Sequence, residues 1–329
     1  IPALFYYGSL FVAVWVEAAR NDIKAVPKNE RPPVSAADWR LSLMFVIPIV
    51  VIITVLISGR SAAMAGLIAT CTGAVLGLMN PAVRGNPSVY LRALAKGGEQ
   101  CARIMVAIAA IGIILGVMNL TGLGIRFSNM ILAFAGSELF FALCLVALAS
   151  VVLGMGLPTI PAYLIIVLIM GQAIENLGVP KILVHLFVLY FGVLSNIIPP
   201  VAIAAYAAAP IAGSNPIPTA FQALKLAFVG FVVPFMIVYN PSLTLVEGFE
   251  IIPFISAILR LGLALWVMTT ALGGVARHRL APFSRFMRLV LGVFILVSQL
   301  EIQIVGVTGI LILFVCEARW LNKSKVIDS

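Results

Sequence analysis

Two apolar segments between Gly154 and Pro210 are each interrupted near the middle, and this feature constrains the fold most strongly. The first interruption reads GMGLPT, at residues 154–159, and the second reads SNIIPP, at residues 195–200. Glycine is costly inside a helix, while proline removes a backbone donor and clashes with the preceding turn. At membrane depth, such irregular backbone is tolerated only where it is buried in protein or lines a cavity. If these segments cross a bilayer, we therefore expect both interruptions to be buried inside the protein or to line a cavity at membrane depth.

The composition places the chain in a membrane. Of its 329 residues, 62% are hydrophobic and only 10% are charged, whereas a soluble domain carries about a quarter charged residues. Repeated long apolar runs predict an all-α integral membrane protein, a polytopic helical bundle in the lipid bilayer. The net charge of +9 does not indicate a nucleic-acid partner, because the basic residues lie in loops between the apolar runs, as the positive-inside rule expects.

The apolar runs predict the positions of the spans. We expect ordinary spans at about 1–16, 41–58, 62–79, 102–119, 219–239 and 251–272, with a last pair at 289–300 and 304–316. Ser88 to Gln100 is expected to form a short helix, either on the membrane surface or in a solvated linker. The apolar piece from Met130 to Ala135 is too short to cross. A basic loop is expected at 277–288.

The segments around residues 154–159 predict a hairpin. Its arms, 139–153 and 160–172, are shorter than the roughly 20 residues of a full span, which favours a re-entrant helical hairpin at about 139–172. Two ordinary spans with a tight turn are the alternative. Only the hairpin puts every strongly basic loop on one side of the membrane.

The second interruption predicts a discontinuous helix at about 182–211, with halves at 182–194 and 201–211. A simple proline kink is the alternative. Adjacent prolines preceded by Ser-Asn favour local unwinding, because a kink needs only one proline.

The interruptions offer oxygen atoms for a hard cation such as Na⁺. The candidate ion ligands are Gly154, Met155, Gly156, Thr159, Ser195, Asn196, Ile197 and Ile198. Close helix packing is the alternative explanation of the glycines. Helix N-termini that follow Pro158 and Pro200 favour an anionic substrate, so the candidate substrate residues are Pro158, Asn196, Pro199 and Pro200. No acid lies in the middle of these segments, which favours sodium over protons as the coupling ion.

Other chemistries are not indicated. The four cysteines, Cys71, Cys101, Cys144 and Cys316, show no CxxC spacing, and His185 and His278 are far apart. Neither a metal other than Na⁺ nor an organic cofactor is therefore expected. The sequence contains no GxxxxGK[ST] loop and no HExxH motif, so we expect neither an ATP-driven pump nor an enzyme.

Three stretches together resemble a known family: GMGLPT, the run from LGVPK to AGSNP at 177–216, and FVGFVVPFMIVYNPSL at 228–243. They are similar to the fused permeases of TRAP transporters, the tripartite ATP-independent periplasmic transporters. In these transporters the fused permease contains the DctM-like large membrane subunit, and the resemblance is nearest to the TAXI-type branch. The resemblance implies an elevator-type transporter with two inverted repeats, each with a hairpin and a broken helix. It implies sodium-driven uptake of organic acids or related small anions, delivered by a TAXI-type periplasmic substrate-binding protein, across the bacterial inner (cell) membrane.

The resemblance also divides the chain. Residues 1–40 resemble the end of the preceding repeat followed by a cytoplasmic linker. Residues 41–240 resemble the second inverted repeat. Residues 241–329 resemble the C-terminal transmembrane helices and a short basic tail. The chain then corresponds to the C-terminal half of a permease whose N-terminal half is missing. A passive channel or scaffold subunit, and a non-functional truncated permease fragment, remain alternatives.

Overall fold

The computed structural model of the chain describes every residue except Pro32, Val34, Gly85, Pro87, Ser137, Pro158, Arg277, His278, Asp328 and Ser329. Among the described residues every named element is helical, beside one isolated bridge between Val275 and Arg279. In the described part of the chain, six helices are long and apolar enough to cross a membrane, at Pro2–Arg20, Asp38–Ile57, Ser88–Met118, Pro216–Tyr239, Ile251–Gly273 and Leu300–Glu317. The predicted all-α polytopic membrane fold is thereby confirmed.

Contacts divide the chain into two compact units, residues 25–109 and residues 1–24 with 110–329. The first unit contains η1 (Lys28–Glu30), α2 (Ala36–Ile57), α3 (Ala62–Gly77), α4 (Pro81–Arg84) and the first part of α5 (Ser88–Thr121). A reciprocal pair of bonds between Ser35 and Asp38 caps the start of α2, which satisfies otherwise free helix donors. Helices α2 and α3 pack together, and the Tyr90 hydroxyl of α5 donates to the Ala74 carbonyl of α3 at 2.9 Å.

Helix α5 differs from the prediction. The expected short helix at 88–100 and the expected span at 102–119 form one continuous helix of 34 residues. Gly97 and Gly98 lie inside this helix, and each glycine costs a helix only about 1 kcal/mol and keeps its backbone donor. No proline lies between Ser88 and Thr121, so the hydrogen-bond ladder has no enforced gap.

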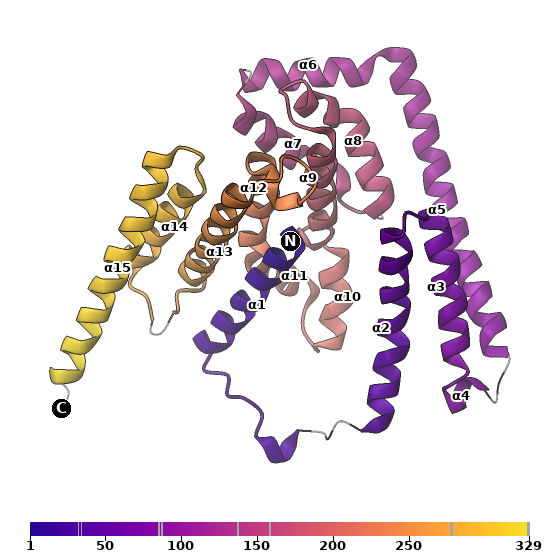
Figure 1. Cartoon of the computed structure of the whole chain (residues 1–329), viewed down its shortest axis with the longest axis horizontal. Coiled ribbons are helices and arrows are strands. Elements are labelled where there is room, and N and C mark those ends of the chain that lie inside the picture. The colour runs from indigo at the N-terminus through magenta and orange to yellow at the C-terminus, as the bar shows by residue number, and fades with distance from the viewer. Residues whose placement is uncertain are drawn as a thin grey trace. The chain divides into compact units, whose positions relative to one another are not determined.

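The second unit contains the remaining helices (Figure 1). They are α1 (Pro2–Arg20), α6 (Leu123–Ala135), α7 (Leu139–Gly154), α8 (Thr159–Glu175), α9 (Lys181–Leu194), η2 (Ser195–Ile197), α10 (Ile203–Ile211), α11 (Pro216–Ala227), η3 (Phe228–Phe231), α12 (Val232–Tyr239), η4 (Pro241–Thr244), α13 (Ile251–Gly273), α14 (Pro282–Leu296) and α15 (Leu300–Ile327). Gly122, at φ +64°, separates α5 from α6, and the chain turns sharply there. Helix α6 is therefore longer than the apolar piece expected at 130–135.

The main core of this second unit lies among helices α6 to α9, α12 and α13, which contribute most of its buried side chains. Smaller clusters of buried side chains join α14 and α15 to α13, and α10 to α11. Fully buried members of the main core include Leu143 of α7, Ile166 of α8, Phe187 of α9, Ile237 of α12 and Leu261 of α13. Phe187 and Phe191 of α9 each make an edge-on contact with Phe235 of α12, which favours one fixed arrangement of α9 against α12.

The C-terminal helices also differ from the prediction. Helix α14 begins at Pro282, seven positions before the expected start at 289, and α15 runs beyond the expected end at 316. Proline at the first helical position is favourable because its missing donor would be unpaired there anyway. Arg285 and Arg288 therefore lie inside α14 and not in the expected basic loop, whose Arg277 and His278 fall outside the described residues.

Candidate functional site

The first interruption joins α7 to α8, which pack against each other. Gly154 ends α7, Met155 is extended, and Gly156 has φ +78°, a left-handed conformation that glycine adopts without strain. Thr159 begins α8, while Pro158 lies outside the described residues. The two arms contain 16 and 17 residues. At 1.5 Å per residue each is about 25 Å long, which is short of the roughly 30 Å hydrocarbon core of a bilayer.

The second interruption separates α9 from α10. The α-helix stops at Leu194, and η2 adds one tight turn. Ile198 is extended, the bond between Pro199 and Pro200 is cis, and Ala202 has φ +33° before α10 starts at Ile203. The helix is therefore discontinuous, and a single proline kink does not describe it.

The two interruptions lie against each other. A Cβ added to Gly154 would lie 2.6 Å from Ser195 Oγ, and one added to Gly156 would lie 3.6 Å from Val201 Cγ1. Helix α7 contacts η2 along the same region. Gly154 therefore lies in a close helix contact, as the alternative explanation of the glycines expects. Close packing also brings the backbone of Gly154 next to Ser195.

The polar groups of this region are neutral. Ser195 is fully buried, and its hydroxyl donates to the Gly192 carbonyl at 2.6 Å. The Asn196 side-chain amide donates to the Val193 carbonyl at 3.3 Å. The carbonyls of Gly154 and Ser195 each accept one amide, from Leu157 and Ile198, at 3.3 Å. Each carbonyl oxygen has two lone pairs, so both can accept a further bond or contact a cation.

The other predicted residues surround this contact. Met155, Thr159, Ile197, Ile198 and Pro199 are half-buried, whereas Gly156 and Pro200 are exposed. No charged residue occurs in either interruption. Among the described residues, no group of three or more His, Cys, Asp or Glu side chains is placed to hold a metal ion.

Sequence reasoning missed three residues near the interruptions. The Tyr206 hydroxyl of α10 donates to the Pro200 carbonyl at 2.6 Å. Ser150 of α7 is fully buried, and its hydroxyl has no partner among the described residues. It lies one helical turn before Gly154, a spacing that places both on one face of the helix and was visible in the sequence. Tyr163 of α8 bonds to Nδ1 of His185 on α9 at 2.5 Å, which links the hairpin to the broken helix.

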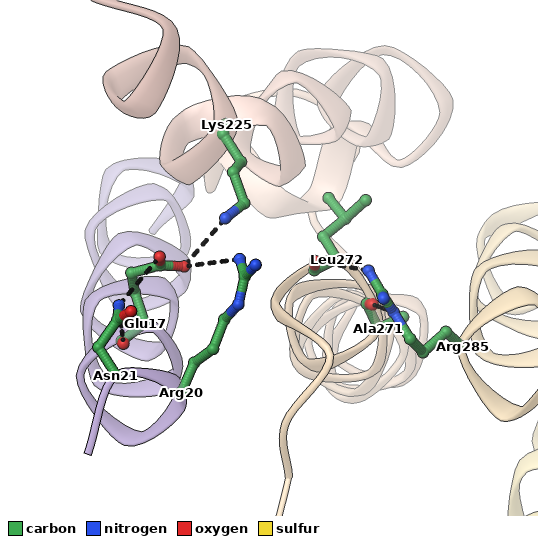
Figure 2. Close-up of polar contacts among 7 residues, drawn as sticks. All are labelled: Glu17, Arg20, Asn21, Lys225, Ala271, Leu272 and Arg285. Carbon is green, nitrogen blue, oxygen red and sulfur yellow. Dashed lines mark hydrogen bonds and ion pairs between the residues drawn. The ribbon is translucent and has the colours of Figure 1, made fainter. Parts of the chain in front are cut away.

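A second polar cluster joins helices that are distant in sequence (Figure 2). Lys225 of α11 donates to the Glu17 carboxylate of α1 at 3.0 Å, and Arg20 lies 3.7 Å from the same carboxylate. Asn21 donates to Glu17 at 3.2 Å. Beside them, Arg285 of α14 donates to the last carbonyls of α13, at Ala271 and Leu272. A cation at a helix C-terminus is favourable because the final carbonyls lack helical partners.

Comparison with known proteins identifies a family. A family described as the tripartite ATP-independent periplasmic transporter, DctM component, matches residues 1–252. Curated proteins and solved structures gave no significant match.

Proposed function

Because the chain belongs to the DctM family of tripartite ATP-independent periplasmic transporters, it is a membrane permease component, and we propose that it couples solute uptake to sodium entry. The family is one of permeases and not of enzymes, and it implies a periplasmic binding protein as partner. The match covers 252 of 329 residues and includes both interruptions.

The contact between Gly154 and Ser195 is the observation that best supports sodium coupling. It brings two stretches of non-helical backbone together without any charged side chain. Hard cations prefer oxygen ligands, and unwound helices in transporters coordinate Na⁺ with carbonyl groups. We propose ligands among Gly154, Met155, Gly156, Thr159, Ser195, Asn196, Ile197 and Ile198. The unpartnered hydroxyl of Ser150 is a further oxygen on the same face of α7.

The substrate is proposed to be a small organic anion. Helix α8 starts at Thr159, the last residue of the first interruption, and α10 starts at Ile203, three residues after Pro200. Helix N-termini carry partial positive charge and free amides, which suits a carboxylate. Asn196, Pro199, Pro200 and Pro158 are the proposed substrate-side residues, of which Pro158 is outside the described part of the chain. The Asn196 amide can supply hydrogen bonds without adding charge.

We propose elevator transport for this permease, with a re-entrant hairpin at α7–α8. The short arms of the hairpin favour entry and exit on one side of the bilayer. We further propose that the chain is the C-terminal half of a TAXI-type permease of the bacterial inner membrane, completed by an N-terminal half and served by a TAXI-type binding protein.

Uptake into proteoliposomes tests the proposal. The full-length permease is reconstituted with its neighbouring binding protein under an inward sodium gradient. Asn196→Ala and Gly156→Leu are compared with wild type. Asn176→Ala and Gly178→Leu, in the loop between α8 and α9, serve as matched controls. Sodium-dependent and binding-protein-dependent uptake that is lost only in the first two variants is expected.

Other outcomes would reject parts of the proposal. Uptake that ignores the sodium gradient and survives both changes would favour a passive channel or scaffold. Equal loss in the loop controls would remove the assignment of the site to the two interruptions. Absence of uptake by the wild type with both partners present would favour a non-functional fragment.

A further inference from the structure

Helices α1, α11 and α13, with Val229 of η3, line a small, partly open cavity beside the Glu17–Lys225 ion pair. Its volume is about 10 Å³, and Glu17, Lys225 and Thr269 line it together with apolar side chains and Gly273. All three helices belong to the same compact unit. The cavity thus joins one polar group from each helix in otherwise apolar surroundings.

Thr269 has an unusual environment for a helical threonine. It is 3% exposed, and its Oγ1 has no hydrogen-bond partner among the described residues. The next residue, Thr270, donates to the Trp266 and Val267 carbonyls one turn back, as helical threonines commonly do. A buried hydroxyl without a partner is costly, so native proteins almost always supply a protein group or an ordered water.

The size and lining of the cavity fit one water molecule. A buried water needs about 10–15 Å³ of accessible space and two to four polar partners. The Thr269 hydroxyl is one partner. The Lys225 ammonium has three N–H donors and gives one to Glu17 at 3.0 Å, while the Glu17 carboxylate can accept several bonds. A sodium ion fits less well, because the Lys225 ammonium lines the same space and repels a second cation.

We propose that this cavity binds one water molecule, which accepts from Thr269 Oγ1 and Lys225 Nζ and donates to the Glu17 carboxylate. The water would complete the hydrogen bonding of Thr269 and hydrate the ion pair that joins α1 to α11. Charged groups in a membrane are retained where they are paired and hydrated. This inference is independent of the proposed sodium and substrate sites.

The sign of a stability change tests the water site. In the purified full-length permease, Thr269→Val is expected to lower the melting temperature by about 2–4 °C, because the water loses a donor. Thr269→Ser keeps the hydroxyl and is expected to behave as wild type. Ser128→Ala is the matched control, because Ser128 is also buried and unpartnered but does not line this cavity. Its removal is expected not to lower the melting temperature.

Three results would overturn the proposal. A melting temperature that is unchanged or raised in Thr269→Val would show an empty cavity around an orphaned hydroxyl. An effect of Thr269→Val that appears only with sodium present would identify a cation as the occupant. An experimental structure that resolves other buried waters but none at Thr269 would exclude the site even if the variants fail to fold.

Discussion

Gly154 and Ser195 approach so closely that a methyl group on Gly154 would lie 2.6 Å from Ser195 Oγ and 3.0 Å from its Cβ. The Ser195 hydroxyl is held in place by its bond to the Gly192 carbonyl, and the residue is fully buried. The serine therefore has little freedom to move aside. This contact holds the end of α7 against the end of α9, so the two non-helical segments depend on each other for their positions.

Gly154→Ala is accordingly expected to destabilise the protein by about 1–3 kcal/mol, the usual cost of an overpacked core. Gly192→Ala provides the control on the same interface, because its Cβ would lie 3.8 Å from Ile166 Cδ1, an ordinary contact. That variant is expected to be neutral or slightly stabilising, since alanine favours a helix over glycine. Thermal unfolding in detergent measures both. Similar losses in the two variants would contradict the importance of the contact.

Tyr206→Phe is expected to loosen the second interruption. The Tyr206 hydroxyl bonds to the Pro200 carbonyl at 2.6 Å, and such a bond contributes about 0.5–1.5 kcal/mol. Hydrogen exchange should become faster at the amides of residues 201–206. Tyr90→Phe, which removes a hydroxyl–carbonyl bond between α5 and α3, should leave exchange in this segment unchanged. Unchanged exchange in Tyr206→Phe would show that the bond does not hold the segment.

Ala202 is expected to respond differently to glycine and to valine. Its φ of +33° is uncommon for a residue with a side chain, and the residue is fully buried. Ala202→Gly should relieve the backbone strain and stabilise the protein by up to about 1 kcal/mol. Ala202→Val should destabilise it by more than that, because a branched side chain tolerates positive φ poorly.

The control for Ala202 is Ala205→Gly, inside α10. Glycine there should cost about 1 kcal/mol because Ala205 has ordinary helical backbone. Chemical denaturation of Ala202→Gly, Ala202→Val and Ala205→Gly would show whether each change raises or lowers the free energy of unfolding. If Ala202→Gly destabilises the protein as much as Ala205→Gly, the conformation at Ala202 is not strained.

The sequence determines some of these features locally and leaves others open. Gly156 and the Pro199–Pro200 pair break a helix by their own backbone chemistry, so the interruptions fall within a few residues of the prediction. The change from the polar pattern of residues 88–100 to the apolar run of residues 102–119 predicted two elements, but it breaks no backbone hydrogen bond, so α5 continues through it. Helix boundaries near Arg285 and Arg288 were misplaced because charge suggested a loop where burial supports a helix.

Pairs of distant residues were the least predictable part. Glu17 and Lys225 are 208 positions apart, and only packing of α1 against α11 brings them together. No acid occurs within the two interruptions, and Glu17 and Glu317 lie far from them in the sequence, so the interruptions did not indicate these acids. The contact of Gly154 with Ser195 was also not predictable, because each residue indicates an interrupted helix but not the residue that it contacts.

The ion pair of Arg288 and Glu317 is expected to stabilise the packing of α14 against α15. Their closest side-chain atoms are 2.6 Å apart, with side chains 2% and 14% exposed. Arg288 also donates to Thr270 at 2.9 Å and lies over the Phe314 ring, while the Ser284 hydroxyl bonds to Glu317. Either Glu317→Leu or Arg288→Met alone leaves a buried charge without its partner, which costs about 3–5 kcal/mol.

The double variant Arg288→Met/Glu317→Leu separates this cost from the net contribution of the pair. Two apolar side chains need no counter-charge, so the double variant should lose less stability than the sum of the single variants. Thermal unfolding of all four proteins gives the coupling. Arg285→Met, which removes a more exposed cation from the same helix, is the control and should cost about 1 kcal/mol or less. Additive losses in the double variant would mean that the two charges are stabilised independently, and that packing of apolar side chains, not the ion pair, holds α15 to α14.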